Sequence, residues 1–378
     1  MKELRDIIAT WKQLHERQTA ALATLVKVEG STYRSPGARM LITSDGQQVG
    51  SISGGCLESD VVKRSQVVLK TGIPNLVKYD TTSEEDLIWG LGLGCQGVAY
   101  ILIEGLNAEQ LNALSVIEQC LFNKQFGAIA TVFSVETTEM KNVERVLLYP
   151  DGSIVSNINN SELEAIAKKD LQSVLQQKQS RSPAYVLTER TAEVFLEIIQ
   201  PPVSLIIFGA GFDVLPVVHF AKALGWYVSV IDPQARSQTK ERFKECDYVI
   251  LGSVDKAISQ IEFNEQFVAV AMSHNYIYDL EFLQRSSSIS LKYLGILGPK
   301  KRTNRLLQDL KYEGCSLPEQ LYSPVGLDIG ADNPEAIALS IIAEIQAVTK
   351  NRMGGFLKDR STPIHSDKPN YVFSKDSI

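Results

Sequence analysis

Apolar residues follow two different patterns along this 378-residue chain, and the pattern changes near residue 200. In the first part, apolar residues at helical spacing predict a helix over residues 4–14, and short apolar runs predict strands. We expect strands at residues 20–28, 39–43, 48–52, 76–79, 98–104, 128–135, 146–149, 154–156 and 194–199, and further helices at 57–70, 108–123 and 161–177. Because strands and helices mix without regular alternation, an α+β N-terminal domain is predicted. No internal repeat is evident.

Strand and helix alternate regularly in the second part of the chain. We expect strands at residues 204–208, 227–231, 248–251, 267–272 and 293–297, each followed by a helix. This alternation predicts an α/β Rossmann-like domain with a doubly wound parallel sheet. A last helix should begin near Asn333, which can cap it, with Pro334 at its first position.

The break between the two patterns falls at Gln200-Pro201-Pro202, where prolines end the preceding strand. The predicted domains are therefore residues 1–200, an α+β domain, and residues 201–350, a Rossmann-like domain. Residues 351–378 are polar and turn-rich, and we expect them to form a C-terminal tail.

Composition narrows the classes of function. The net charge is −6 and the Lys and Arg residues are dispersed, which argues against a nucleic-acid or anionic membrane partner. No stretch reaches about 18 consecutive apolar residues, and residues 1–17 lack the apolar core of a signal peptide. Five cysteines, an odd number with no CxxC pair, argue against a disulfide scaffold or zinc knuckle. We expect a cytoplasmic protein.

Two cysteines stand in glycine-rich turns. Cys56 follows Gly54-Gly55 and precedes a predicted helix, and Cys95 follows Gly94 in GLGLGCQG. A thiol at a helix N-terminus ionises more easily, and thiolate binds soft metals or attacks sulfur. The glycines leave room for a bulky cofactor, whose anionic oxygens their amides could bind. The alternative is that both cysteines are small buried side chains in tight turns. Because the pattern occurs twice, we favour function for Cys56, followed by Cys95.

A turn-rich loop at residues 29–39 carries Arg34 and Arg39. Either guanidinium could hold a phosphate or a carboxylate. Taken alone, each could equally be a solvated surface charge.

The second domain carries an altered dinucleotide fingerprint. Gly209 and Gly211 follow an apolar strand and open a helix, where backbone can approach a phosphate. Asp232 ends the second strand, where an acidic residue can bind ribose hydroxyls. The expected third small residue is Val214, so the alternative is a Rossmann-like scaffold without a dinucleotide.

Two further loops follow strands of the same sheet. His274 could carry a proton or bind a metal, or it could be an ordinary surface histidine. Residues 300–302, Lys-Lys-Arg, could pair with a phosphate, or could be a solvated helix start.

Several long motifs resemble the xanthine dehydrogenase accessory factors, the XdhC/CoxI family. They are residues 28–40 (VEGSTYRSPGARM), 50–60 (GSISGGCLESD), 89–97 (WGLGLGCQG), 205–211 (LIIFGAG), 293–298 (YLGILG) and 324–344 (PVGLDIGADNPEAIALSIIAE). The resemblance implies binding of molybdenum cofactor, its sulfuration with a cysteine desulfurase, and its delivery to an apo-hydroxylase. By position, Cys56 resembles the family's cofactor-linked cysteine, and Cys95 its second glycine-flanked cysteine.

The chain departs from the family at one sheet edge. Phe212 stands where the family has His after GAG, and residues 274–276 read His-Asn-Tyr where it often has His-Asp-His. Both changes remove an imidazole, which puts a metal or acid–base role of the second domain in doubt.

Four functions are compared on these grounds. A cofactor chaperone would use Cys56 as thiolate ligand of the molybdenum centre or carrier of its sulfur. A nicotinamide- or flavin-dependent oxidoreductase would use Gly209, Gly211 and Asp232, and bound NAD or flavin would favour it. A molybdenum hydroxylase is excluded because the closely spaced cysteines of iron–sulfur clusters are missing. A structural adaptor would function without Cys56. A homodimer is expected on general frequency alone.

Overall fold

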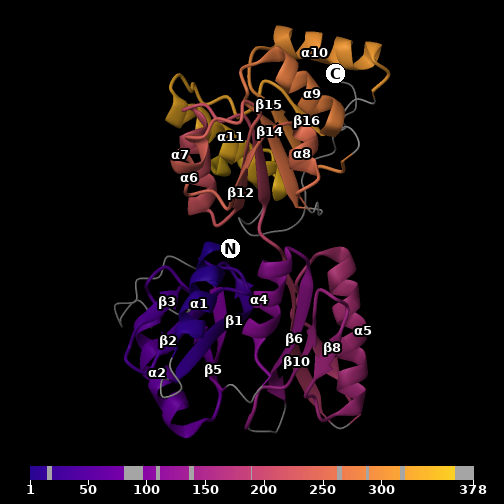
Figure 1. Cartoon of the computed structure of the whole chain (residues 1–378). Helices are drawn as coiled ribbons and strands as arrows, with labels where there is room; N and C mark the ends of the chain where they lie inside the picture. The colour runs from indigo at the N-terminus through magenta and orange to yellow at the C-terminus, as the bar shows by residue number, and fades with distance from the viewer. Residues whose placement is uncertain are drawn as a thin grey trace. The chain divides into compact units, whose positions relative to one another are not determined.

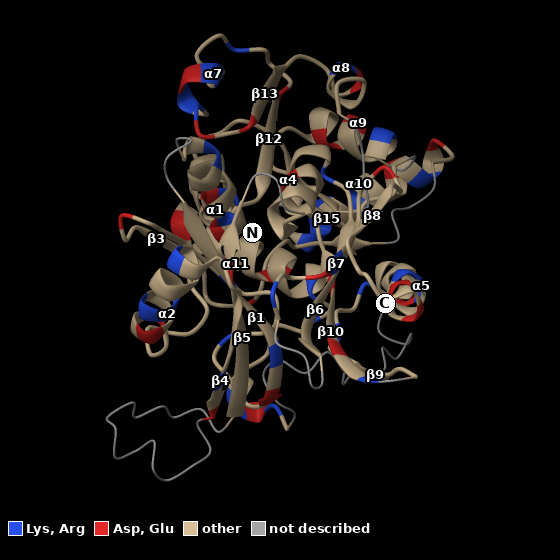
Figure 2. Cartoon of the chain, turned by 90° about the horizontal axis from the view of Figure 1, so that it is seen from below, with Lys and Arg blue, Asp and Glu red and all other residues tan. Residues whose placement is uncertain are grey.

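The chain forms two compact units in the computed structural model. It describes residues 1–14, 19–80, 97–107, 111–135, 140–188, 190–261, 266–286, 289–315 and 320–361. One unit comprises Lys2–Pro201, and the other Pro202–Ile378 together with Met1 (Figure 1). No helix among these described residues is long and apolar enough to cross a membrane. Figure 2 shows positive and negative positions interspersed along the helices and strands.

The N-terminal unit is built on two five-stranded antiparallel sheets, as expected of an α+β domain. Sheet A has the strand order β3-β2-β1-β5-β4, and sheet B has the order β8-β7-β6-β10-β9. The elements of the first half are α1 (Lys2–Gln13), β1 (Ala20–Gly30), β2 (Arg39–Thr43), β3 (Gln48–Gly50), α2 (Glu58–Thr71), β4 (Asn75–Asp80) and β5 (Gly97–Leu106). Those of the second are α4 (Ala113–Asn123), β6 (Gly127–Val135), β7 (Arg145–Leu148), β8 (Ile154–Ser156), α5 (Ser161–Gln177), β9 (Ala184–Val186) and β10 (Thr191–Ile199).

The two halves repeat one topology, so the expectation of no internal repeat was wrong. In each, a helix precedes three strands, a second helix follows, and two further strands close the sheet in the same order. We call residues 2–106 the first repeat and residues 113–199 the second repeat.

The strand register also repeats. Thr24 lies opposite Arg39 in sheet A, as Thr131 lies opposite Arg145 in sheet B. Likewise Leu22 faces Glu104, as Ile129 faces Glu197. Short sequence echoes mark the duplication: ALAT at residues 21–24 against AIAT at 128–131, and Asp-Gly hairpins at 45–46 and 151–152. They are brief because only a few buried and turn positions constrain the side chain.

The hydrophobic core of this unit follows the repeats. Helix α2 packs on sheet A around Val61 and Val68, and α5 packs on sheet B around Leu163 and Leu171. Helices α1 and α4 share a further cluster with Leu22 and other residues from both sheets. The repeats therefore form one packed body, in which the strand ends present their connecting loops.

The C-terminal unit is a six-stranded sheet whose strand pairs are all parallel, as predicted. Its order is β13-β12-β11-β14-β15-β16. The elements are β11 (Ser204–Phe208), α6 (Val214–Ala223), β12 (Tyr227–Asp232), α7 (Thr239–Arg242), β13 (Tyr248–Leu251), α8 (Val254–Ile258), β14 (Phe267–Ala271), α9 (Tyr276–Ser286), β15 (Tyr293–Ile296), α10 (Lys300–Tyr312), β16 (Leu321–Tyr322), α11 (Pro334–Thr349) and the 3-10 turn η1 (Leu357–Asp359).

Hydrophobic clusters lie on both faces of this sheet. Alternate residues of β11 point to opposite sides: Ile207 joins the cluster with α6 and α11, and Phe208 joins that with α8, α9 and α10. Asn333 caps α11 as expected, since its side chain accepts from Ala336 N at 2.9 Å. The short strands β9 and β16 were not predicted, because two or three residues carry no readable alternation.

Candidate functional site

Two of the described connections lie at the same edge of sheet A. Strand β1 ends at Gly30, β2 begins at Arg39 and β3 ends at Gly50, so loops 31–38 and 51–57 share that edge. Asp80 and Gly97, the last residue of β4 and the first of β5, lie there too. Two of the motifs singled out from the sequence are thereby brought together.

Cys56 is exposed in loop 51–57, together with Gly54 and Gly55. Gly55 has φ +108°, a conformation that favours glycine, and open space surrounds its Cα. A side chain at Gly54 would instead touch the ring of Tyr33, at 3.4 Å. The thiol is therefore open to a ligand, and the backbone beside it carries no side chains.

The Cys56 loop is longer than its counterpart in the second repeat. Residues 51–57 connect β3 to α2, whereas the shorter stretch 157–160 connects β8 to α5. Ile52 and Ile158 occupy matching buried positions at the start of the two connections. The extra residues of the first repeat include the Gly-Gly-Cys turn, so this turn is the part of the duplicated scaffold that differs.

Glu58, which the sequence analysis missed, organises this loop. Its carboxylate accepts from Ser53 N at 2.8 Å, Ser51 Oγ at 2.9 Å and Leu57 N at 3.2 Å. Burial acts to raise its pKa, but hydrogen bonds, first from Ser53 and then from Ser51, lower the pKa to about 2. An acidic residue in the first turn of a helix was the available signal.

Arg34 and Arg39 are both paired. Arg34 Nη1 donates to Glu3 Oε1 at 2.9 Å, which ties loop 31–38 to α1. Arg39 is only 2% exposed in its side chain and forms a two-point ion pair with Glu197 of the second repeat, at 2.7 Å for Nη1 to Oε1. The expectation that Arg39 could hold a cofactor anion is therefore corrected: it is a buried structural residue.

Gly94 and Cys95 fall outside the described residues. Among the described residues, no group of three or more His, Cys, Asp or Glu side chains could hold a metal ion.

A cavity of about 1420 Å³ lies at the corresponding edge of sheet B. It is lined by residues of β4, β5, β6 and β8, by residues 140–144, and by Arg190. None of the residues singled out from the sequence lines it.

The glycine-rich turn of the C-terminal unit is constrained by packing. Gly209 has φ +130°, and a Cβ there would lie 2.3 Å from the carbonyl oxygen of Met272. A Cβ at Gly211 would meet Asp213 Oδ1 at 2.3 Å. Val214 replaces the third small residue of the dinucleotide fingerprint. It is fully buried in the core, so the fold accommodates its larger side chain.

Asp232 is closed to a ribose. It is 0% exposed, and its carboxylate accepts from Arg236 Nε at 2.9 Å, from Gln234 N at 3.1 Å and from the hydroxyl of Thr239. Burial acts to raise its pKa, but the hydrogen bonds, first from Arg236, lower it overall. A nicotinamide dinucleotide bound in the usual way would have to displace these donors, so Asp232 does not fit the cofactor-binding role expected from the sequence.

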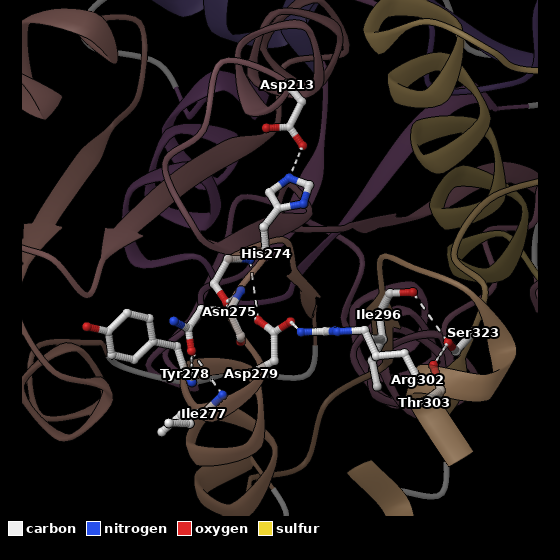
Figure 3. A network of polar contacts seen from close by, with 11 residues as sticks. Asp213, His274, Asn275, Ile277, Tyr278, Asp279, Ile296, Arg302, Thr303 and Ser323 are labelled. Atoms are coloured by element: carbon white, nitrogen blue, oxygen red, sulfur yellow. Dashed lines mark hydrogen bonds and ion pairs between the residues drawn. The ribbon is translucent and has the colours of Figure 1, made fainter. Parts of the chain in front are cut away.

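His274 follows β14, and Gly209 and Gly211 follow the neighbouring strand β11, where the strand order of the sheet reverses. Figure 3 shows the imidazole of His274 directed toward Asp213. His274 has φ +56°, and its Nε2 lies 2.7 Å from Asp213 Oδ2. The imidazole is 61% exposed. Beside it, buried Asp279 binds Arg302 Nη2 at 2.8 Å, so one cation of the Lys-Lys-Arg cluster is already engaged.

Comparison with known proteins places these features in a family. Residues 13–80 match the model of the XdhC and CoxI family, and residues 205–345 match that of the XdhC Rossmann domain. A Bacillus subtilis protein, named as a probable subunit of xanthine dehydrogenase, is 33% identical over 88% of this chain and 94% of its own.

Two further relatives extend the comparison. The molybdenum cofactor insertion chaperone PaoD of Escherichia coli is 22% identical over 87% of this chain and 83% of its own. A solved Bacillus halodurans structure, described as a xanthine dehydrogenase, superposes with a TM-score of 0.76 at 32% identity, covering 93% of this chain and 97% of that one. Since two models match in chain order and one relative covers nearly the whole length, this chain belongs to the XdhC and CoxI family.

Proposed function

We propose that this protein is an accessory factor that binds molybdenum cofactor and delivers it to a xanthine dehydrogenase-type molybdenum hydroxylase. The observation that carries the proposal is the exposed Cys56 thiol, set in a glycine-flanked turn that only the first of two repeats possesses. The names of two relatives support it, since one refers to xanthine dehydrogenase and the other to insertion of molybdenum cofactor.

The chemistry of the turn suits this cargo. Thiolate is a soft ligand of the kind that would suit molybdenum. Gly54 and Gly55 are exposed and have no side chains of their own, and backbone amides in such turns can bind anionic oxygens. A carrier must also release its cargo, so moderate binding is expected.

Sulfuration of the bound cofactor, with a cysteine desulfurase as partner, is the second part of the proposal. The Cys56 thiolate would attack the outer sulfur of a cysteine persulfide on the desulfurase, so that a persulfide forms on Cys56 and the desulfurase cysteine leaves as thiolate. Cys95 is proposed as the second thiol on sequence grounds. The exposure of Cys56 supports this role because sulfur transfer between proteins needs an accessible thiolate.

The test is cargo retention after co-expression with cofactor biosynthesis. We expect Cys56→Ala to reduce bound molybdenum and oxidised pterin fluorescence at least about tenfold, as expected for loss of roughly 1.4 kcal/mol or more of binding. Metal content and fluorescence per purified chain are the measurements.

Cys315→Ala is the matched control, because that thiol is half-buried in the other unit. It should retain wild-type cargo. Equal cargo on Cys56→Ala and wild type would remove the role assigned to this thiol and would favour a structural adaptor.

A nicotinamide- or flavin-dependent oxidoreductase is the alternative interpretation of the C-terminal unit. The close-packed Gly209 turn and the Asp213–His274 pair favour a ligand at that sheet edge. The enclosed carboxylate of Asp232 weighs against a ribose there. Mass spectrometry of the purified protein discriminates the two, since co-purified NAD or flavin would support the oxidoreductase.

A further inference from the structure

The carboxylate of Glu58 holds loop 51–57 in place through hydrogen bonds. Five donors converge on Glu58: the backbone amides of Ile52, Ser53 and Leu57 and the hydroxyls of Ser51 and Ser53. These donors come from both ends of the loop, so their hydrogen bonds to Glu58 hold the two ends of the Gly-Gly-Cys turn together. Glycine is the most flexible residue, and two consecutive glycines would otherwise leave the thiol without a defined position.

The hydroxyl of Ser53 links the two ends directly as well. It donates to Glu58 and accepts from Leu57 N at 3.1 Å. Buried Ile52 and Leu57 anchor the loop on either side of the turn. The exposed residues 54–56 therefore project to solvent between two anchored ends.

The second repeat offers a comparison, because its helix α5 also has an acidic first turn. Glu162 also lies in the first turn of its helix, α5. Its carboxylate accepts from the amide and hydroxyl of Thr188, at 3.2 and 3.1 Å, and not from the connection that precedes its helix. The first turn of α5 also contains Glu164, whose pKa is lowered by hydrogen bonds first from Lys168 and then from Ser156 at the end of β8. What sets Glu58 apart from both of these carboxylates is the convergence of five donors from its longer loop.

We propose that Glu58 is a positioning residue of the Cys56 site, which holds the thiol and the bare backbone beside it in one arrangement before cargo binds. The inference deepens the proposed function and rests on it for the identity of the cargo. Preorganisation of this kind raises affinity because less ordering entropy is lost on binding.

The test compares Glu58→Gln with Glu162→Gln in the full-length chain. Glutamine keeps the size of the side chain but replaces one acceptor oxygen by a donor. We expect Glu58→Gln to speed amide hydrogen exchange at residues 52, 53 and 57 roughly tenfold, the effect of one lost hydrogen bond. Bound molybdenum and pterin should fall several-fold after co-expression. Glu162→Gln should leave both readouts at wild-type values.

Each outcome decides the inference. Unchanged exchange in residues 51–57 of Glu58→Gln overturns it. Faster exchange in Glu58→Gln with undiminished cargo also overturns it, provided that Cys56→Ala loses its cargo. If Cys56→Ala keeps its cargo, the proposed function fails, and the exchange rates alone decide whether Glu58 orders the loop. Should Glu58→Gln not fold, Ser53→Ala, which removes one donor and one acceptor, is measured in the same way and should show a smaller change of the same sign.

Discussion

Two buried ion pairs join the repeats reciprocally at the residue scale. Arg39 of the first repeat pairs with Glu197 of the second, and Arg145 of the second pairs with Glu104 of the first. Both arginines begin their strands and both glutamates lie at matching register positions. Each arginine thus carries its charge into the other half of the unit. Neither arginine can be recognised as buried from the sequence, because each is paired inside the fold with a glutamate of the other repeat.

Breaking one of these pairs should be costly. Arg39→Met leaves the Glu197 carboxylate buried without its cation, and we expect a loss of about 3–5 kcal/mol in the free energy of unfolding. Urea denaturation followed by circular dichroism measures it.

Two controls accompany this variant. Arg64→Met breaks an exposed pair with Asp60 and should cost less than about 1 kcal/mol. The double change Arg39→Met with Glu197→Leu should recover most of the loss, since no charge remains buried. An Arg39→Met protein as stable as wild type would mean that the pair does not hold the repeats together.

At the element scale, the two repeats are alike in their sheets, and they differ in a connecting loop. The two repeats agree in strand order and register, and they differ in the β3–α2 connection that bears Cys56. The C-terminal unit follows the same rule, because its candidate ligand residues stand in the turns after β11 and β14. Loops placed on a rigid scaffold are where new chemistry is most easily added.

The turn after β11 should not tolerate a side chain. Gly209→Ala combines φ +130° with a Cβ position 2.3 Å from a backbone oxygen of the neighbouring loop. We expect a loss of about 3 kcal/mol in the stability of the C-terminal unit, measured by chemical denaturation. Gly314→Ala is the matched control: its φ is +74° with nothing within 4 Å, so strain alone should cost about 1 kcal/mol. Equal losses in both would refute the close-packing argument.

The whole molecule consists of two units with separate cores. Each of the buried hydrophobic clusters draws its residues from within 4–199 or from within 203–348. A core confined to one segment is the property that lets a domain fold by itself. The proposed cofactor-handling site and the Rossmann-like sheet are accordingly built on independent scaffolds.

Residues 202–378, produced alone, should therefore fold. We expect a cooperative thermal transition and a far-ultraviolet circular dichroism spectrum of an α/β protein. Absence of a cooperative transition would show that this unit needs residues 2–201 for its stability.

Pattern and chemistry in the sequence determined the fold class, most element positions and the family. Periodic apolar runs such as residues 204–208 report burial directly, and Asp-Gly at 45–46 reports a hairpin, because each depends on neighbours in the chain. The glycine-flanked cysteine at residue 56 is a local signal of the same kind, whereas its exposure is seen only in the structure.

Only the tertiary structure decided which charged residues are available. Arg39 and Asp232 looked like ligands for a phosphate and a ribose, yet partners from distant or folded-back segments occupy both. The duplication and the role of Glu58 emerged in the same way, from register and converging donors. The physical reason is that burial and pairing depend on how the chain folds back on itself, across the two repeats for Arg39 and within the adjoining loop for Asp232 and Glu58. Periodicity and turn signals can instead be read directly from neighbouring residues.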